Sequence, residues 1–430
     1  KAHGNTAQIN RNARDDNTAF APCPLPTLDS LRALLAESRI DLPDDLPPMA
    51  AGVFGYIGYD AVRLMENLPD ENPDVLGVPD AMLIRPTMMA IFDNIKDEIT
   101  LVTPVWPGEQ KPRAAYTQAV ERIELTIEEL SKPLPVSAGE DPFTRIEAPL
   151  SNTGQAEYER MVAAAKEYIS AGDIFQVVLS QRFDTKFSLP PFSLYRALRR
   201  INPSPYLYFL NFDGFSVVGS SPEILVRVRG GKVSIRPIAG TRPRGKTRAE
   251  DEALGAELLD DPKERAEHLM LLDLGRNDVG RVAKIGTVEV TDQFFLEHYS
   301  QVMHIVSNVE GELDEKYDAI SALIAGFPAG TVSGAPKVRA MEIIDELEKD
   351  KRGIYAGCVG YFSANGDMDT CIVLRTAIVK DGVMHVQAGA GIVADSDPAS
   401  EHMECNHKAG ALFRAAEEAA RFAGAPVKGQ

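Results

Sequence analysis

Two arrays of short strand-like segments constrain the fold of this chain more than any other feature. Each array alternates runs rich in β-branched and aromatic residues with turns that contain glycine, and the arrays span residues 206–238 and 357–387. Asp-Gly, Gly-Gly and Asn-Gly turns favour hairpins, and hairpins join antiparallel strands. The arrays therefore predict large antiparallel sheets, and their similar layout suggests an internal duplication.

Helical patterns are segregated from these strands. Apolar residues recur at helical spacing over residues 114–130, 262–274 and 398–422. Strand runs with segregated helices favour an α+β protein over an alternating α/β sheet.

A stretch rich in Pro, Ser and Gly divides the chain. We expect an N-terminal lobe at residues 1–135, a linker at 136–152, a main domain at 153–424 and a tail at 425–430. The first residue is Lys1 rather than Met, so we expect that a longer protein has lost its N-terminus.

The charge balance excludes some partners. Lys and Arg number 45 and Asp and Glu number 63, so the net charge is −18. Nucleic acids and anionic membrane surfaces both attract basic proteins, so we expect neither as a partner. No apolar run approaches the roughly 18 residues that span a bilayer. The four cysteines form no C-x-x-C pair, which favours reduced thiols in a cytoplasmic protein.

Two segments share one acidic design, in which an Asp-Pro pair is followed by two glutamates three residues apart. The glutamates are Glu264 and Glu267 in the first segment and Glu401 and Glu404 in the second. Each pair shares one helix face, and the two pairs could converge on one hard cation such as Mg²⁺. Acidic residues are also favoured in the first turn of any helix, so both interpretations stay open.

Three glycine-containing loops could bind a ligand, and simpler structural explanations exist for two of them and for one histidine. Residues 389–394 match the dinucleotide fingerprint formally, but the following helix begins too late for that role. The glycines could instead present N–H groups to a carboxylate, or they could simply end a strand. Residues 237–245 and 327–337 could each hold an anion, although the first, taken alone, is better explained as a solvated turn. His304 lies in an apolar run, which is typical of a buried structural histidine.

Together these segments resemble the chorismate-utilising enzymes. The matching segments are residues 237–245, 261–281, 304–312, 327–337 and 387–408. Within that family the chain is most similar to the large subunits of anthranilate synthases, with further likeness at residues 56–60 and 202–206. The resemblance covers nearly all of residues 49–424.

The resemblance implies an anthranilate synthase-like, chorismate-binding fold. In that fold duplicated αββ units form a four-layer α/β/β/α arrangement, with large antiparallel sheets packed together and helices outside. It also implies that residues 1–135 are a truncated regulatory lobe and that residues 153–424 are the chorismate-binding catalytic domain.

The same resemblance assigns roles to individual residues. Glu267 and Glu404 match Mg²⁺ ligands, with Glu264 and Glu401 in support, and the ion would neutralise one carboxylate of chorismate. Glu223 matches the general acid that protonates the departing C4 hydroxyl. The implied substrate contacts are Gly240, Thr241, Tyr355, Arg375, Gly389, Ala390, Gly391 and Lys408.

Further matches concern catalysis and the choice of nucleophile. His304 matches a histidine near the ring that is implicated in pyruvate elimination, and Thr331 matches a residue that lines the site. Gln176 stands where water-adding relatives have a lysine base, so the resemblance favours ammonia. Ala239 stands where aminodeoxychorismate synthases usually have a covalent lysine. Both positions favour anthranilate synthase over its relatives.

The implied reaction adds ammonia to chorismate at C2 while the C4 hydroxyl leaves, and it then eliminates pyruvate. This is the first committed step of tryptophan biosynthesis. The ammonia would come from a glutamine amidotransferase subunit, so we expect a hetero-oligomer. L-tryptophan would inhibit through a site that includes Pro205, Tyr206 and Leu207. Residues 34–38 do not match the other half of that site, because they carry an inserted Ala in a helical stretch.

Overall fold

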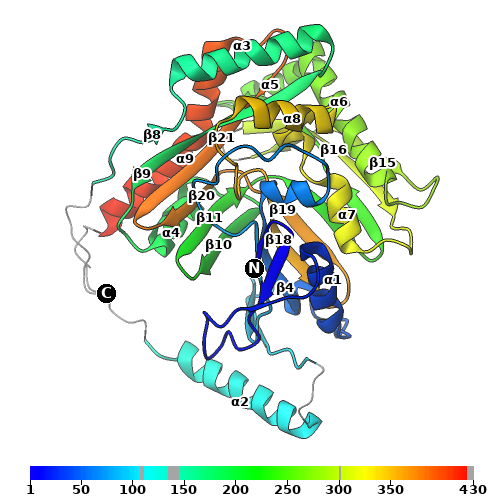
Figure 1. Cartoon of the computed structure of the whole chain (residues 1–430), viewed down its shortest axis with the longest axis vertical. Helices are drawn as coiled ribbons and strands as arrows, with labels where there is room; N and C mark the ends of the chain where they lie inside the picture. The colour runs from blue at the N-terminus through cyan, green and yellow to red at the C-terminus, as the bar shows by residue number, and fades with distance from the viewer. Residues whose placement is uncertain (107–110, 134–144, 300–301, 424–430) are drawn as a thin grey trace.

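Two antiparallel sheets form the centre of the protein, and helices cover their outer faces (Figure 1). The computed structural model describes residues 1–106, 111–133, 145–299 and 302–423. The predicted α+β architecture with large antiparallel sheets is confirmed.

The larger sheet has twelve strands in the order β14-β16-β13-β12-β19-β18-β4-β5-β1-β2-β3, with β15 on the other side of β16. Its strands are β1 (Ala2–His3), β2 (Thr6–Ile9), β3 (Ala21–Pro22), β4 (Gly52–Ile57), β5 (Ala81–Ile84), β12 (Ile224–Arg229), β13 (Lys232–Ile235), β14 (Ile238–Pro243), β15 (Glu289–His298), β16 (Val302–Glu312), β18 (Cys358–Ser363) and β19 (Met368–Ile372).

The smaller sheet has seven strands in the order β10-β11-β20-β21-β9-β17, with β8 paired to β9. Its strands are β8 (Leu150–Ser151), β9 (Gln176–Lys186), β10 (Tyr206–Phe212), β11 (Phe215–Ser221), β17 (Gly334–Ala335), β20 (Thr376–Lys380) and β21 (Val383–Ile392). The sheets pack face to face through a buried cluster in which Tyr56, Val359 and Cys371 of the larger sheet meet Tyr208 and Val217 of the smaller one.

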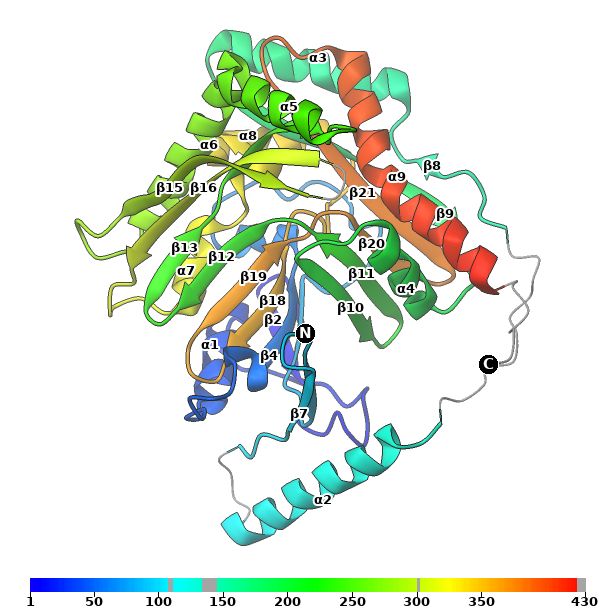
Figure 2. The same ribbon diagram turned by 180° about the vertical axis from the view of Figure 1, so that it is seen from behind.

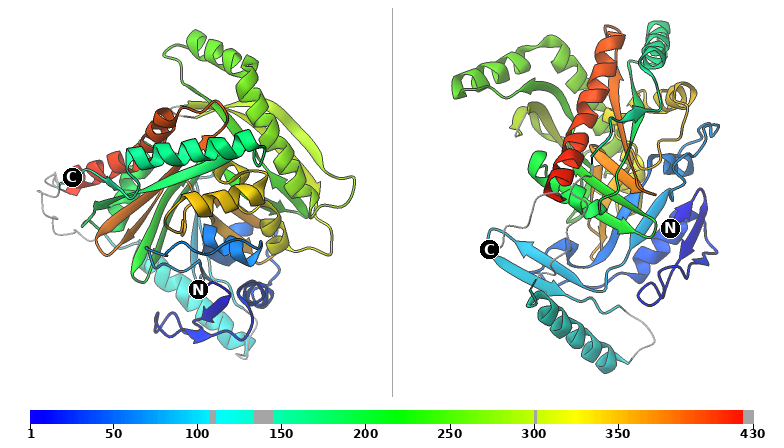
Figure 3. Two further views of the ribbon diagram at one scale, coloured as in Figure 1. Left: turned by 45° about the horizontal axis from the view of Figure 1, so that its top comes forward. Right: turned by 90° about the vertical axis from the view of Figure 1, so that its left-hand side faces the viewer.

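Helices form the two outer layers, as Figures 2 and 3 show from other directions. The smaller sheet is covered by α3 (Gln155–Ala171), α4 (Pro191–Ile201) and α9 (Pro398–Ala423), and α8 (Lys337–Leu347) also packs on β9. The larger sheet is covered by α5 (Arg248–Asp260), α6 (Pro262–Gly280) and α7 (Ala319–Gly326). The remaining described helices near the sheets are α1 (Thr27–Glu37) and the 3₁₀ turns η1 (Pro48–Ala50), η2 (Tyr59–Leu64) and η3 (Gly330–Val332).

Each strand array is divided between the two sheets. The first array places β10 and β11 in the smaller sheet and β12 and β13 in the larger one, whereas the second array does the reverse. Each array therefore forms two separate hairpins rather than one continuous meander, and the pairing within each hairpin is antiparallel as predicted. Pro222, which has no N–H to donate to a ladder, lies where the first array leaves the smaller sheet.

N-terminal strands continue the larger sheet. β4 pairs with β18 along its whole length, so one sheet contains residues from both expected domains. The pair β6 (Met89–Asp93) and β7 (Glu98–Val102) forms a separate two-stranded sheet, and α2 (Pro112–Leu130) lies apart from the two large sheets in Figures 1 and 2. The division into lobe and catalytic domain stays a prediction, and much of the predicted linker and all of the tail lie outside the described residues.

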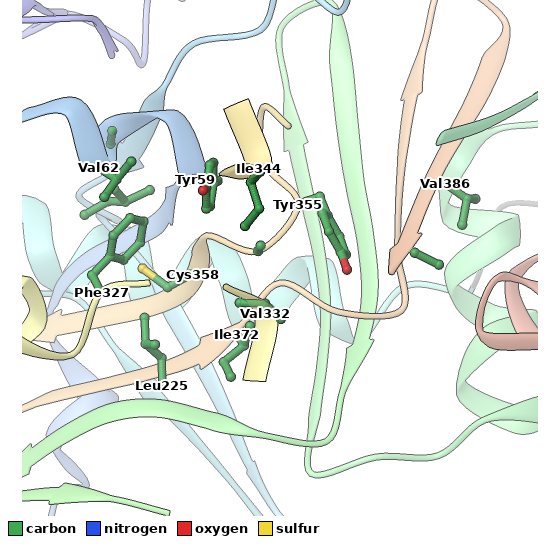
Figure 4. Packing of buried hydrophobic residues seen from close by; sticks show 14 of the residues in the cluster. Tyr59, Val62, Leu225, Phe327, Val332, Ile344, Tyr355, Cys358, Ile372 and Val386 are labelled. Atoms are coloured by element: carbon green, nitrogen blue, oxygen red, sulfur yellow. The ribbon is translucent and has the colours of Figure 1, made fainter. Parts of the chain in front are cut away.

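The main core lies between the sheets and the helices that cover them. Figure 4 shows part of this buried cluster, in which Val386 of β21, Leu225 of β12 and Ile344 of α8 take part. Among the described residues, we find no helix with the length and apolar character needed to cross a membrane.

Candidate functional site

A cleft of about 470 Å³ holds most of the residues singled out above. The predicted residues that line it are Gln176, Glu223, Gly240, Thr241, Glu264, Glu267, His304, Thr331, Tyr355, Arg375, Gly389, Gly391, Glu401, Glu404 and Lys408. Ala390 does not line it, because alternation along β21 turns this side chain into the core, where it is fully buried.

The two points where the chain passes between the sheets lie side by side at this cleft. Glu223 follows β11 and precedes β12, and Arg375 lies between β19 and β20. β11 pairs with β20 and β12 pairs with β19, and the Ile372 N–H donates to the Glu223 carbonyl oxygen at 3.0 Å. Arg375 has a φ of +48°, which few non-glycine residues adopt. The crossings thus bring an acid and a guanidinium from distant segments to one place.

Glu223 is held in its neutral form by burial. Its side chain accepts a hydrogen bond from the Thr331 hydroxyl at 3.0 Å, and the residue is 7% exposed. Loss of water raises the pKa of this carboxyl to about 8, and the Thr331 hydrogen bond and the charges of Arg375 and Lys408 offset only part of that rise. At neutral pH Glu223 therefore carries a proton that it can donate.

The acidic starts of α6 and α9 face the same cleft. Asp261 caps α6 by accepting from two backbone N–H groups, and Asp397 accepts from the Ser400 N–H at 2.9 Å in the first turn of α9. Burial raises the pKa of Glu267, and the nearby carboxylates of Glu264 and Glu404 raise it further. A carboxylate of α9 thus lies close enough to act on one of α6.

This donor set fits a hard cation. In the part of the chain that the structure describes, no group of three or more His, Cys, Asp or Glu side chains is arranged to hold a metal ion. Mg²⁺ is commonly bound by one or two carboxylates together with waters and a substrate oxygen, so a smaller set is sufficient. Glu267 and Glu404, whose repulsion a cation would relieve, are the residues that fit best.

His304 is a neutral imidazole at the cleft wall. Its Nδ1 lies 3.0 Å from the Gly240 carbonyl oxygen and 3.1 Å from the Thr241 hydroxyl, and the contact with the carbonyl requires the proton on Nδ1. Burial lowers the pKa of His304. The Nε2 atom therefore retains a free lone pair. Gly240 has a φ of +75° at a bulge in β14, and this places its carbonyl against the ring.

Gln176, the first residue of β9, lines the cleft and has a buried amide. The residue is 3% exposed, and its Oε1 is buried with no hydrogen-bond partner among the described residues. Its Nε2 lies 3.5 Å from the Glu267 carboxylate. A Cβ at Gly391 would lie 2.6 Å from Nε2, so glycine at that position leaves space for the amide.

Comparison with known proteins identifies the family. The profile of the family described as chorismate binding enzyme matches residues 2–414. The chain belongs to this family of chorismate-binding enzymes. Similar curated proteins include anthranilate synthase component 1 of Cereibacter sphaeroides, which is 59% identical over 98% of this chain and 85% of that protein. Anthranilate synthase component 1 of Thermus thermophilus is 49% identical over 91% of this chain and 84% of that protein.

Solved structures of chorismate-binding enzymes share the fold. Anthranilate synthase component I of Streptococcus pneumoniae superposes with a TM-score of 0.83 at 39% identity, covering 92% of this chain and 88% of that one. The menaquinone-specific isochorismate synthase of Escherichia coli has a TM-score of 0.67 at 23% identity, covering 90% of this chain and 98% of that one. The second likeness concerns the fold alone.

The residues predicted for tryptophan lie outside the cleft. Pro205 precedes β10, where Tyr206 pairs with Ser221 of β11, and the Tyr206 hydroxyl donates to Asp369 at 3.1 Å. Tyr206 packs against the buried cluster between the sheets, and Leu207 is half-buried.

Other cleft residues were not singled out from the sequence. Lys263 lines the cleft, and its Nζ lies 2.8 Å from the Asp395 carboxylate, which joins the starts of α6 and α9. Gln387 also lines the cleft and donates to the Ser180 hydroxyl at 2.8 Å. Lys263 directly follows Pro262 at the predicted start of a helix, so the sequence could have indicated this residue. No local sequence pattern indicates Gln387.

Proposed function

We propose that this chain is the large subunit of an anthranilate synthase, which converts chorismate and ammonia into anthranilate, pyruvate and water. The observation that carries the proposal is the cleft itself, in which a protonated carboxyl group lies opposite a cluster of carboxylates. Chorismate is a dianion with a leaving hydroxyl group, and it needs both an acid and a way to hold its charges. Relatives that are 48–59% identical bear the name anthranilate synthase component 1.

The substrate carboxylates would be held at two places. Arg375 offers a forked guanidinium, and the backbone around Gly389 and Gly391 lies beside the Tyr355 hydroxyl. Glu267 and Glu404 would hold Mg²⁺, with Glu264 and Glu401 nearby in support. When bound, the ion supplies the positive charge that this acidic region needs in order to accept a carboxylate.

The first step is an amination at C2. Glu223 donates its proton to the C4 hydroxyl, which leaves as water while ammonia attacks C2, and the ring double bonds shift. Loss of a proton from the new ammonium group gives aminodeoxyisochorismate. Gln176 lines the cleft, and its neutral amide supplies no base that would activate water, whereas ammonia brings its own lone pair and needs none.

The second step is an elimination. The C2 proton leaves, the C–O bond to the enolpyruvyl group breaks, and the proton returned to the enolate gives pyruvate as the ring becomes aromatic. His304 is neutral and keeps Nε2 free, so it can take part in the proton transfer, with Thr241 and Gly240 fixing the ring.

Ammonia would come from a separate glutamine amidotransferase subunit in a hetero-oligomer. Glutamine hydrolysis by such enzymes needs a reactive thiolate, and burial raises the pKa of Cys358, Cys371 and Cys405. These three thiols stay protonated at neutral pH.

Tryptophan inhibition is a further part of this proposal. Pro205, Tyr206 and Leu207 lie beside Ser221, two residues before Glu223. An inhibitor bound at this segment would therefore act on the strand end that carries the general acid.

The test is direct. Purified chain with chorismate, Mg²⁺ and an ammonium salt should produce the fluorescence of anthranilate without the partner, and EDTA should abolish it. A non-aromatic amino product detected by mass spectrometry would instead indicate an aminodeoxychorismate synthase, although Ala239 at the cleft lacks an amine. Gln176→Lys should admit water as nucleophile, and a variant that still makes only anthranilate would contradict the role given to Gln176.

A further inference from the structure

A buried ion pair lies directly behind the substrate cleft. Arg352 is 1% exposed, and its guanidinium donates to Glu348 at 2.9 and 2.5 Å. The same group donates to the carbonyl oxygens of Val332 at 2.7 Å and Val178 at 2.6 Å. A charge this deeply buried is tolerated only where such partners replace water.

Glu348 extends the network to the neighbouring strands. Its Oε1 accepts from the Ser180 N–H at 2.7 Å and from the Ser180 hydroxyl at 2.9 Å. Ser180 of β9 lies opposite Gly389 of β21, and its hydroxyl also accepts from Gln387 at 2.8 Å. The ion pair therefore holds β9 in place and, through Ser180, also holds β21, which carries Gly389 and Gly391.

The backbone groups held by this pair belong to the cleft walls. Val178 and Val332 line the cleft themselves. Gln176 lies two residues before the first, and Thr331, which hydrogen-bonds Glu223, lies directly before the second. Two segments that line the cleft thus share one pair of charged side chains.

The network also reaches the N-terminal part of the chain. The guanidinium of Arg352 lies 4.8 Å from the ring centroid of Tyr59 and 5.6 Å from that of Tyr355. Figure 4 labels both tyrosines in the buried cluster. Next to Tyr59, Asp60 accepts from the Gly353 N–H at 2.7 Å and pairs with Arg63 at 2.6 Å. Residues 59–63 therefore contact the segment that ends at Tyr355.

We infer that the Arg352–Glu348 pair is a positioning device for the substrate cleft and joins the N-terminal segment 59–63 to the substrate-contacting Tyr355. Arg352 does not line the cleft itself, and it acts by holding Val178, Val332 and Tyr355 in register. The inference rests on the proposed function only in naming chorismate as the molecule that the cleft receives.

The experiment compares Arg352→Lys with a control at a second cation that donates to a backbone carbonyl. Lys keeps the charge but cannot reach both carbonyls and Glu348 in a fork. The control is Lys380→Met, which removes an ammonium group that donates to the Leu76 carbonyl oxygen at 2.6 Å and does not line the cleft. We expect R352K to raise KM for chorismate at least tenfold with a smaller change in kcat, whereas K380M lowers thermal stability and leaves KM within twofold.

Amide hydrogen exchange supplies a readout that does not need turnover. In R352K, exchange should accelerate at least tenfold in residues 176–182, 330–335 and 386–392, and K380M should leave these segments unchanged. Tyr59→Leu, which leaves the ion pair intact, should raise KM about threefold and should serve if R352K does not fold.

The possible outcomes distinguish the positioning role of the ion pair from the proposed function. Equal exchange in these segments for R352K and K380M, or KM within twofold of the parent for both R352K and Y59L, would overturn the positioning role. A parent protein that makes no anthranilate would count against the proposed function, and the exchange data would still decide whether the pair orders the cleft.

Discussion

Two groups of carboxylates face the same cleft and differ in their surroundings. Glu223 lies alone at the crossing between the sheets, where burial keeps it protonated. The four glutamates of α6 and α9 lie at helix starts, close to one another and to Lys263 and Lys408. The difference fits the two roles that we propose for one residue type: isolation in a dry site favours a proton donor, and crowding at helix starts favours binding of a cation.

The largest effect should come from Glu223→Gln. The amide keeps the shape and the Thr331 contact but has no acidic proton, so kcat should fall about 10³-fold, within the range for a general acid. Anthranilate fluorescence measures the rate, and calorimetric Mg²⁺ binding is the control that should not change. A variant that retains more than a tenth of the parent activity would show that Glu223 is not the acid.

Glu267→Gln should weaken the proposed cation site formed by the glutamates of α6 and α9. Mg²⁺ affinity should fall about 10²-fold, because even the loss of an outer partner of a metal ligand costs 10–100-fold. Without Mg²⁺ the melting temperature should stay equal or rise, since repulsion from Glu264 and Glu404 is relieved. Magnesium titration by calorimetry and melting in EDTA provide the two measurements, and unchanged affinity would remove Glu267 from the site.

The pH dependence of the activity and of the stability tests whether Glu223 carries a proton. Below about pH 8 Glu223 is protonated and can donate, and above it the carboxyl ionises, so kcat/KM should fall about tenfold per pH unit. The raised pKa also means that the folded state holds an extra proton between the usual value of 4.5 and about 8, so this group's contribution to the free energy of unfolding declines as pH rises through that window. E223Q should lack this decline in a melting series from pH 5 to 9.

The smallest effect should come from Glu401→Gln. Burial and the neighbouring Glu404 raise the pKa of Glu401, whose role we describe as supporting. Mg²⁺ affinity should therefore change by about threefold or less, a difference typical of a nearby charge in partly screened surroundings. A loss as large as that in E267Q would make Glu401 a direct ligand.

Local patterns predicted some elements well and others badly. The Asp-Pro starts of α6 and α9 were predicted, because capping and the first-turn proline are local effects. α7 was missed because its eight residues are apolar on every face and show no helical period. The apolar run at residues 175–179 indicates only the start of β9, which continues to Lys186, since buried polar residues such as Ser180 and Arg182 hide the strand character of its second half.

The sequence alone determined the antiparallel pairing, through glycine turns, and the acidic helix starts, through their caps. Only the tertiary structure decided that each array splits between two sheets, and hence that Glu223 and Arg375 lie side by side although 152 positions separate them. The same long-range packing removed water from Glu223, fastened the cleft to Arg352 and buried the amide of Gln176. Turn and cap preferences act over a few residues, whereas burial depends on the whole chain.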